Sequence, residues 1–134
     1  MADSMEEGQG KVLIIDDDAS FLKIIKKYVR DNYPCLHVNG CEDPVKGLAA
    51  ISADLDLLLL DLEMPGLDGG KILSYAKSLG INKSRIIILS GRDADYLHEI
   101  FPMGSCLAVL NKHEVRQKAV LDMVFSALQT KCGS

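Results

Sequence analysis

The sequence predicts a doubly wound α/β fold, in which helices cover both faces of a parallel β-sheet. Short apolar runs rich in branched side chains alternate with segments whose apolar residues recur at helical spacing, and this alternation is typical of such folds. Several of the runs are almost continuously apolar, as expected for strands that are buried on both faces. The predicted strands are residues 11–15, 35–39, 56–60, 85–89 and 106–110.

Helices are predicted between these strands and after the last one. The first ends before Pro34, since proline disfavours continuation, and the second, at about residues 43–51, has Pro44 at its first position, where proline is tolerated. The third starts near Gly69 and ends at Gly80, which fits a C-terminal cap. The apolar positions are Phe21, Ile24, Ile25, Tyr28 and Val29 in the first helix and Ile72, Leu73, Ala76 and Leu79 in the third. In the short fourth helix they are Leu97, Ile100 and Phe101, and in the fifth they are Val120, Met123, Val124, Ala127 and Leu128.

The chain has 134 residues, a length that fits one domain with a proper core. We expect a flexible leader at residues 1–10, one domain at residues 11–130 and a short tail at residues 131–134. Hydrophobic residues make up 48% and charged residues 25% of the chain, which is ordinary globular usage. The net charge of -4 argues against direct binding to nucleic acid or to anionic membrane surfaces.

The four cysteines, Cys35, Cys41, Cys106 and Cys132, lack the paired short spacings of a zinc site or a redox motif. We therefore predict reduced thiols in a cytoplasmic protein. No apolar run approaches the roughly 20 residues of a membrane span, and the start of the chain has no apolar signal-peptide core.

Polar residues follow four of the predicted strands. Parallel sheets of this kind bind ligands beyond the carboxyl ends of their strands, so these residues should meet at one edge of the sheet. They are Asp16 and Asp17 after the first strand, Asp61 after the third, Ser90 after the fourth, and Asn111 and Lys112 after the fifth.

This residue set suits phosphoryl transfer. Clustered carboxylates without Cys or His form a hard oxygen site that suits Mg²⁺, and an aspartate beside the ion can attack a phosphoryl group. A lysine ammonium and a serine hydroxyl can stabilise the phosphoryl oxygens. Of the opening acidic triplet, Asp18 is expected to cap the first helix or to stay in solvent.

Four segments, "LIIDDD", "DLEMPGLDG", "ILSG" and "LNK", occur in this order between residues 11 and 130. With them the chain resembles a receiver domain of bacterial two-component response regulators, the CheY-like phosphoacceptor module. The resemblance implies a flavodoxin-like (βα)5 three-layer sandwich with strand order 2-1-3-4-5. It also implies a signalling switch, whose only chemistry is its own phosphorylation and dephosphorylation, rather than an enzyme.

The resemblance also implies site roles. Asp61 matches the phosphoacceptor, Asp17 a direct Mg²⁺ ligand and Asp16 a ligand acting largely through water. The backbone carbonyl of Glu63 matches the third protein ligand. Ser90 and Lys112 match the residues that bind the phosphoryl group. The expected partners are a histidine kinase or a histidine phosphotransfer protein, a downstream protein or an output domain outside this chain, and a second copy through the face of the fourth helix, fifth strand and fifth helix.

Two residues depart from the family pattern. His113 follows Lys112 where a proline with a cis bond is usual, and a cis bond without proline costs ~2.5–4 kcal/mol, so a trans bond is predicted. Val109 replaces a common aromatic residue, which leaves Ser90 and loop movement to carry an activation signal. Glu63 and Arg92 match positions that tune the lifetime of the acyl phosphate.

Two other functions fit parts of the sequence. "DDDAS" resembles the nucleophile motif of haloacid-dehalogenase-like phosphatases, with Asp16 as nucleophile and Asp18 as acid. That reading leaves "DLEMPGLDG" unexplained, and the chain is short for that fold. A receiver-like interaction module that is never phosphorylated is the other alternative.

Overall fold

A computed structural model describes residues 10–61, 69–90, 106–111 and 115–133. In these ranges the chain forms a five-stranded parallel sheet of order β2-β1-β3-β4-β5. The strands are β1 (Gly10–Ile15), β2 (Leu36–Cys41), β3 (Leu57–Asp61), β4 (Ile86–Ser90) and β5 (Ala108–Asn111). The predicted doubly wound fold and its strand order are confirmed.

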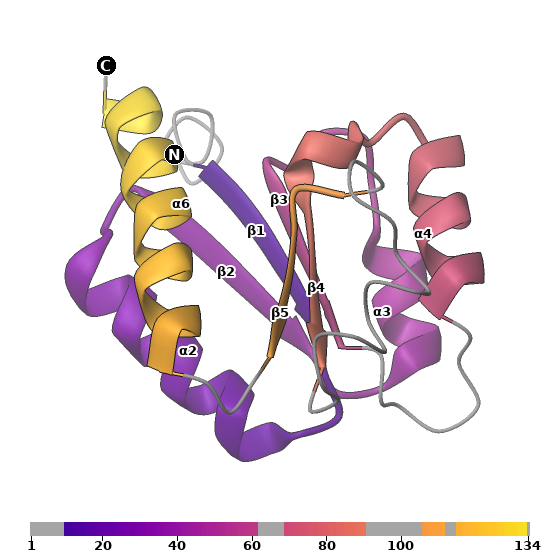
Figure 1. The fold of residues 1–134 in the computed structure, drawn as a ribbon, viewed down its shortest axis with the longest axis horizontal. Helices are drawn as coiled ribbons and strands as arrows, with labels where there is room; N and C mark the ends of the chain where they lie inside the picture. The colour runs from indigo at the N-terminus through magenta and orange to yellow at the C-terminus, as the bar shows by residue number, and fades with distance from the viewer. Residues whose placement is uncertain (1–9, 62–68, 91–105, 112–114, 134) are drawn as a thin grey trace, which may run out of the picture.

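The helices lie on both faces of the sheet. They are α2 (Ala19–Asn32), α3 (Pro44–Ala50), α4 (Gly69–Ser78) and α6 (Val115–Gly133), together with a 3-10 turn, η1 (Lys83–Arg85), that the sequence pattern did not predict. Helices α2 and α6 cover one face, and α3 and α4 cover the other (Figure 1). The predicted helix around Leu97–Phe101 lies outside the described residues.

Successive side chains along the strands point to opposite faces of the sheet and pack into two hydrophobic cores, one on each face. Val12 and Ile14 pack toward α2 and α6, where they meet Leu22 and Phe125. Leu13 and Ile15 pack on the opposite face with residues of α4. The central strands are buried at every position, since β3 and β4 have a neighbouring strand on each side and helices above and below.

Two glycines shape the helices on the second face. A Cβ atom on Gly47 of α3 would lie 2.7 Å from Ile15 Cγ2, so glycine allows α3 to approach β1. Gly80 has φ 98°, a left-handed conformation that favours glycine, and its N–H donates to Lys77 O at 3.0 Å. The predicted cap at Gly80 is therefore confirmed.

Helices α2 and α6 are joined by polar contacts as well as by the core. Tyr28 OH donates a hydrogen bond to Asp122 Oδ1 at 2.5 Å, and Tyr33 OH donates to the same atom at 3.0 Å. Lys118 Nζ lies 5.1 Å from the centroid of the Tyr28 ring. These contacts connect residues about ninety positions apart in the chain.

The prediction of four reduced thiols is wrong for two of them. Cys35, just before β2, forms a disulfide bond with Cys132 in the last turn of α6. Short spacings between cysteines give no sign of this pair, because the fold brings the two residues together across 97 positions. Cys41 and Cys106 remain thiols.

The chain limits of the domain stay a prediction, although β1 begins at Gly10 and α6 continues to Gly133, beyond the tail boundary expected at residue 130. No helix within the described ranges combines the length and the apolar character needed to cross a membrane.

Candidate functional site

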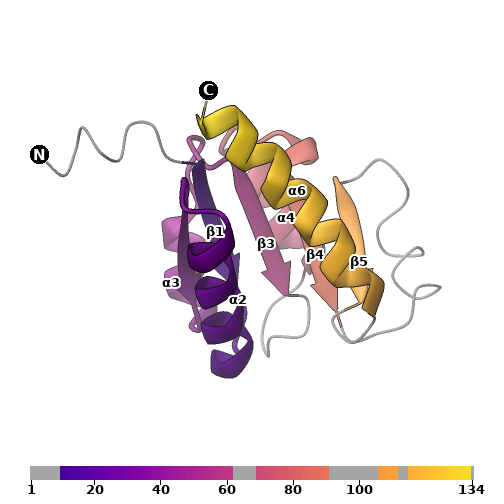
Figure 2. The ribbon, with the colours of Figure 1, turned by 90° about the vertical axis from the view of Figure 1, so that its left-hand side faces the viewer.

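The polar residues predicted to converge are placed at the carboxyl edge of the sheet by strand register. Ile15 of β1 is level with Leu60 of β3, so Asp16 and Asp61 follow at the same height on neighbouring strands. Asp61 is level with Leu89, which puts Ser90 one position further along β4. Figure 2 shows the arrowheads of β3 and β4 at this shared edge.

Three carboxylates meet there. One oxygen from each of Asp16, Asp17 and Asp61 lies within 4.8 Å of the others. Asp16 and Asp61 are buried, while Asp17 is exposed. Two buried acids and a third facing solvent bring like charges close together, and a divalent cation would offset their repulsion.

Backbone pairing holds Asp16 in place. Its N–H donates to Cys41 O at 3.0 Å, which extends the pairing of β1 and β2 beyond Ile15. Its Oδ1 accepts the N–H of Asp18 at 2.9 Å. The carboxylate is therefore oriented by the turn that leads into α2 rather than by side-chain packing alone.

The acidic triplet divides as the sequence suggested. Asp18 has extended backbone angles, and its side chain accepts the N–H of Phe21 at 3.1 Å, so it is the N-cap of α2. Its carboxylate is not part of the acidic cluster formed by Asp16, Asp17 and Asp61. In the chain, Asp17 lies between Asp16, the buried ligand candidate, and Asp18, the cap of α2.

Ser90 is fully buried at the end of β4 and is level with Asn111, the last residue of β5. Asn111 therefore brings the chain to the same edge just before Lys112. Val109, which replaces the common aromatic residue, is partly buried and packs against the core on the α3 and α4 face. Glu63, Arg92, Lys112 and His113 lie outside the described residues, so their expected roles and the predicted trans bond stay predictions.

One contact that supports the site was not predicted from the sequence. The carbonyl of Cys41 anchors Asp16, although Cys41 lies on a different strand and carries no motif. A backbone carbonyl has no residue-type signal, so only the register of β1 against β2 reveals it.

The fold and the site together define a doubly wound α/β domain with an edge site of hard oxygen ligands. A family described as the response regulator receiver domain matches residues 12–123. Because this match covers most of the sequence, the chain belongs to the response regulator receiver domain family. The resemblance recognised in the sequence is thereby confirmed, and the chain is a receiver domain of two-component signalling.

Curated relatives are response regulators that are longer than the matched segment. The chain is 32% identical over 92 residues to the transcriptional regulatory protein ResD of Bacillus subtilis, a match that covers 67% of this chain and 37% of ResD. It is 38% identical over 69 residues to the cyclic di-GMP phosphodiesterase response regulator RpfG of Xanthomonas campestris, covering 51% of this chain and 18% of RpfG.

Solved structures support the fold. A response regulator receiver domain protein from Clostridium thermocellum superposes with a TM-score of 0.71 at 22% sequence identity. The superposition covers 91% of this chain and 95% of that one. At this identity the likeness concerns the fold.

Proposed function

We propose that the domain is a phosphorylation-controlled switch in which Asp61 accepts a phosphoryl group from a phosphohistidine. The Asp61 carboxylate attacks phosphorus, the bond between phosphorus and the imidazole nitrogen breaks, and an acyl phosphate forms on Asp61. The imidazole of the donor leaves with the electron pair of that bond and takes up a proton. The modified edge then changes the affinity of the domain for a partner.

The observation that carries this proposal is the meeting of Asp16, Asp17 and Asp61 within 4.8 Å at the edge where Ser90 is buried. Asp61 ends a strand that is buried along its whole length; it pairs with Leu89 of β4, and the preceding residue, Leu60, pairs with β1 as well as with β4. A nucleophile held in this way needs little reorganisation to reach an incoming phosphorus atom.

The donor set fits Mg²⁺, a hard cation with oxygen ligands that keeps several waters. Asp16, Asp17 and Asp61 would hold the ion, and the backbone carbonyl of Glu63 is proposed as a further ligand. When bound, Mg²⁺ neutralises charge on the phosphoryl oxygens and on the acids around them. Ser90 is proposed to donate its hydroxyl to one phosphoryl oxygen, and Lys112 to pair with another or with the carboxylate of Asp61.

The partners follow from this chemistry. We propose a sensor histidine kinase or a histidine phosphotransfer protein as the donor, in the cytoplasm. The output is proposed to be a downstream protein or a domain outside this chain. A homodimer is proposed to form through the face of the predicted fourth helix, β5 and α6. The chain's own chemistry is proposed to be limited to gaining and losing the phosphoryl group, with Glu63 and Arg92 setting its lifetime.

The test is incubation with acetyl phosphate and Mg²⁺, followed by intact mass and peptide mapping. We expect one phosphoryl group on Asp61 that is absent in Asp61→Asn and in the presence of a chelator. Asp18→Asn is the matched control, since it changes a neighbouring acid outside the carboxylate cluster and should be phosphorylated normally. A wild-type chain that takes up no phosphoryl group, or takes it up on another residue, would contradict the proposal.

The geometry does not favour the phosphatase alternative. That mechanism needs Asp18 as an acid beside Asp16, whereas Asp18 is occupied as the cap of α2. Steady phosphatase turnover that is lost in Asp16→Asn and kept in Asp61→Asn would reverse this preference. An absence of both Mg²⁺ binding and phosphorylation would favour the interaction module instead.

A further inference from the structure

The segment before β2 is docked on one face of α6. The α6 residues that touch it recur at spacings of three and four, which places them on a single side of the helix. They are Asp122, Phe125, Gln129 and Cys132. The disulfide to Cys35 is therefore the last of four contacts along a helix stripe.

The first three of these contacts involve no sulfur. Tyr33 OH donates to Asp122 Oδ1 at 3.0 Å, and the Tyr33 ring centroid lies 5.7 Å from that of Phe125, which is fully buried. Gln129 Oε1 accepts the N–H of Cys35 at 2.9 Å. The segment is thus held against α6 before any covalent bond is considered.

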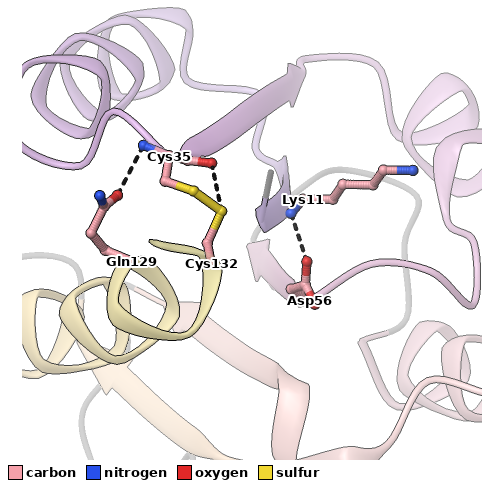
Figure 3. The surroundings of a disulfide bond; sticks show 5 residues. All are labelled: Lys11, Cys35, Asp56, Gln129 and Cys132. Atoms are coloured by element: carbon pink, nitrogen blue, oxygen red, sulfur yellow. Dashed lines mark hydrogen bonds between the residues drawn. A yellow bond between two sulfur atoms is a disulfide. The ribbon is translucent and has the colours of Figure 1, made fainter. Parts of the chain in front are cut away.

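The peptide units around Cys35 are fixed on two sides. The N–H of Cys35 is bound by Gln129, and its carbonyl accepts the N–H of Gly10 at 3.1 Å (Figure 3 shows the Gln129 contact). Cys132 Sγ lies 3.4 Å from the same carbonyl oxygen, a position from which a thiol can donate a weak hydrogen bond. Reduction requires the two sulfur atoms to move apart, and a Cys132 thiol would then have this carbonyl oxygen close by as a hydrogen-bond acceptor.

We propose that Cys35 and Cys132 form a reversible thiol–disulfide switch that locks the C-terminal turns of α6 onto the start of β2. The two Cα atoms are 6.2 Å apart, within the range that a disulfide requires without backbone movement. Both residues are partly exposed, so a small thiol or disulfide can reach them. In a cytoplasmic protein a disulfide is usually transient and redox-sensing, which agrees with a reversible bond rather than a permanent one.

The oxidant is a small-molecule disulfide such as glutathione disulfide. One cysteine thiolate attacks a sulfur of the oxidant, the sulfur–sulfur bond breaks, and one glutathione thiolate leaves. The second cysteine thiolate then attacks the mixed disulfide on the first and displaces the other glutathione. Two protein thiols and one small disulfide are converted to one protein disulfide and two small thiols, and an excess of reduced thiol drives the reverse reaction.

The bond restrains the C-terminal end of α6. It joins the last turn of α6 to the residue just before the edge strand β2, and the two cysteines are 97 positions apart in the chain. In the reduced form α6 is held near its end by the hydrogen bond from the Cys35 N–H to Gln129 Oε1. The last turn of α6 can then fray, as helix ends do. In the oxidised form fraying of that turn would require movement of the start of β2.

The test compares the reduced and oxidised full chain under native conditions. Reduced protein treated with glutathione disulfide should gain one Cys35–Cys132 bond, identified by peptide mapping, and keep no glutathione adduct. After denaturation, four thiols should react with a maleimide in the reduced protein and two in the oxidised protein. Amide hydrogen exchange in the last turn of α6 and at residues 35–36 should be slower by about tenfold or more in the oxidised form.

Cys132→Ser should abolish both the bond and the redox effect on exchange, and Cys106→Ser is the matched control that should keep them. Because the main comparison uses the wild-type chain, it holds even where a variant folds poorly. A stable glutathione adduct at Cys35 or Cys132, a bond that forms only in denaturant, or equal exchange rates in the two forms would overturn the proposal. None of these measurements depends on phosphorylation of Asp61.

Discussion

Replacing Asp17 with Asn should weaken Mg²⁺ binding and, at the same time, stabilise the metal-free domain. The carboxylate oxygens of Asp16, Asp17 and Asp61 lie within 4.8 Å of one another. At that separation two unit charges repel by about 0.86 kcal/mol in bulk water, the weakest case. Asp17 takes part in two of the three pairs, so the substitution relieves about 1.7 kcal/mol at low ionic strength.

The same distance sets a lower bound on the loss of Mg²⁺ affinity. The carboxylate oxygens lie within 4.8 Å of one another, and a doubly charged ion even that far from one carboxylate would be attracted to it by about 1.7 kcal/mol in bulk water. Removing that attraction raises the dissociation constant by about 20-fold, and more where Asp17 is a direct ligand. The substitution should therefore move stability and metal affinity in opposite directions.

Asp18 supplies the control. Asp18→Asn keeps a good helix cap and should change neither stability nor Mg²⁺ binding, whereas Asp18→Ala loses the bond to the Phe21 N–H and should cost about 1 kcal/mol. For a domain of this size that cost lowers the melting temperature by about 4 °C. Mg²⁺ binding should be unchanged in both variants, because the cap lies outside the acidic cluster.

The assay is thermal unfolding by circular dichroism at low ionic strength, with and without Mg²⁺, combined with calorimetric Mg²⁺ titration. Asp17→Asn should melt up to about 7 °C above wild type without Mg²⁺ and should lose most of the stabilisation that Mg²⁺ gives to wild type. Equal losses of Mg²⁺ affinity in Asp17→Asn and Asp18→Asn, or a lower melting temperature of Asp17→Asn without Mg²⁺, would refute the division of the triplet.

Two further perturbations address the packing around the sheet. Gly47→Ala places a Cβ 2.7 Å from Ile15 Cγ2 and should destabilise the domain by about 1–3 kcal/mol in urea unfolding. The added cost should be much smaller in an Ile15→Ala background, and equal costs in both backgrounds would show that this contact is not the cause. The hydrogen bond to Asp122 raises the pKa of Tyr28 to about 12 from its ordinary value of 10.0. Unfolded chains therefore lose this proton first, so the stability that it contributes is present below about pH 10 and is lost between about pH 10 and 12. Tyr28→Phe should show a smaller fall in the urea midpoint across that window, and an unchanged fall would contradict the assignment.

The sequence allowed the sheet and most of the acidic edge to be predicted. Continuous apolar runs identify strands that are buried on both sides, and residues after such strands must meet because parallel strands end at one edge. Asp16, Asp61 and Ser90 could be grouped on this basis alone, and the structure places them there.

Contacts between distant segments without a motif were not predictable. The disulfide partners are 97 positions apart, and the expectation of reduced thiols used only local spacing. The stripe of Asp122, Phe125 and Gln129 that docks the segment before β2 mixes acidic, aromatic and amide side chains, so it carries no hydrophobic periodicity. Such a face becomes visible only when the position of α6 against β2 is known.

The place of β1 between β2 and β3 has a consequence for folding kinetics. A fragment that contains β1 and α2 carries Asp16 and Asp17 but lacks the third acid, which arrives only when β3 pairs with β1. Pairing of segments so far apart in the chain is a slow, late step for sheets of this kind. Mg²⁺ uptake during refolding would therefore report when β3 has paired with β1. A nascent or partly unfolded chain could not accept a phosphoryl group before that pairing is complete.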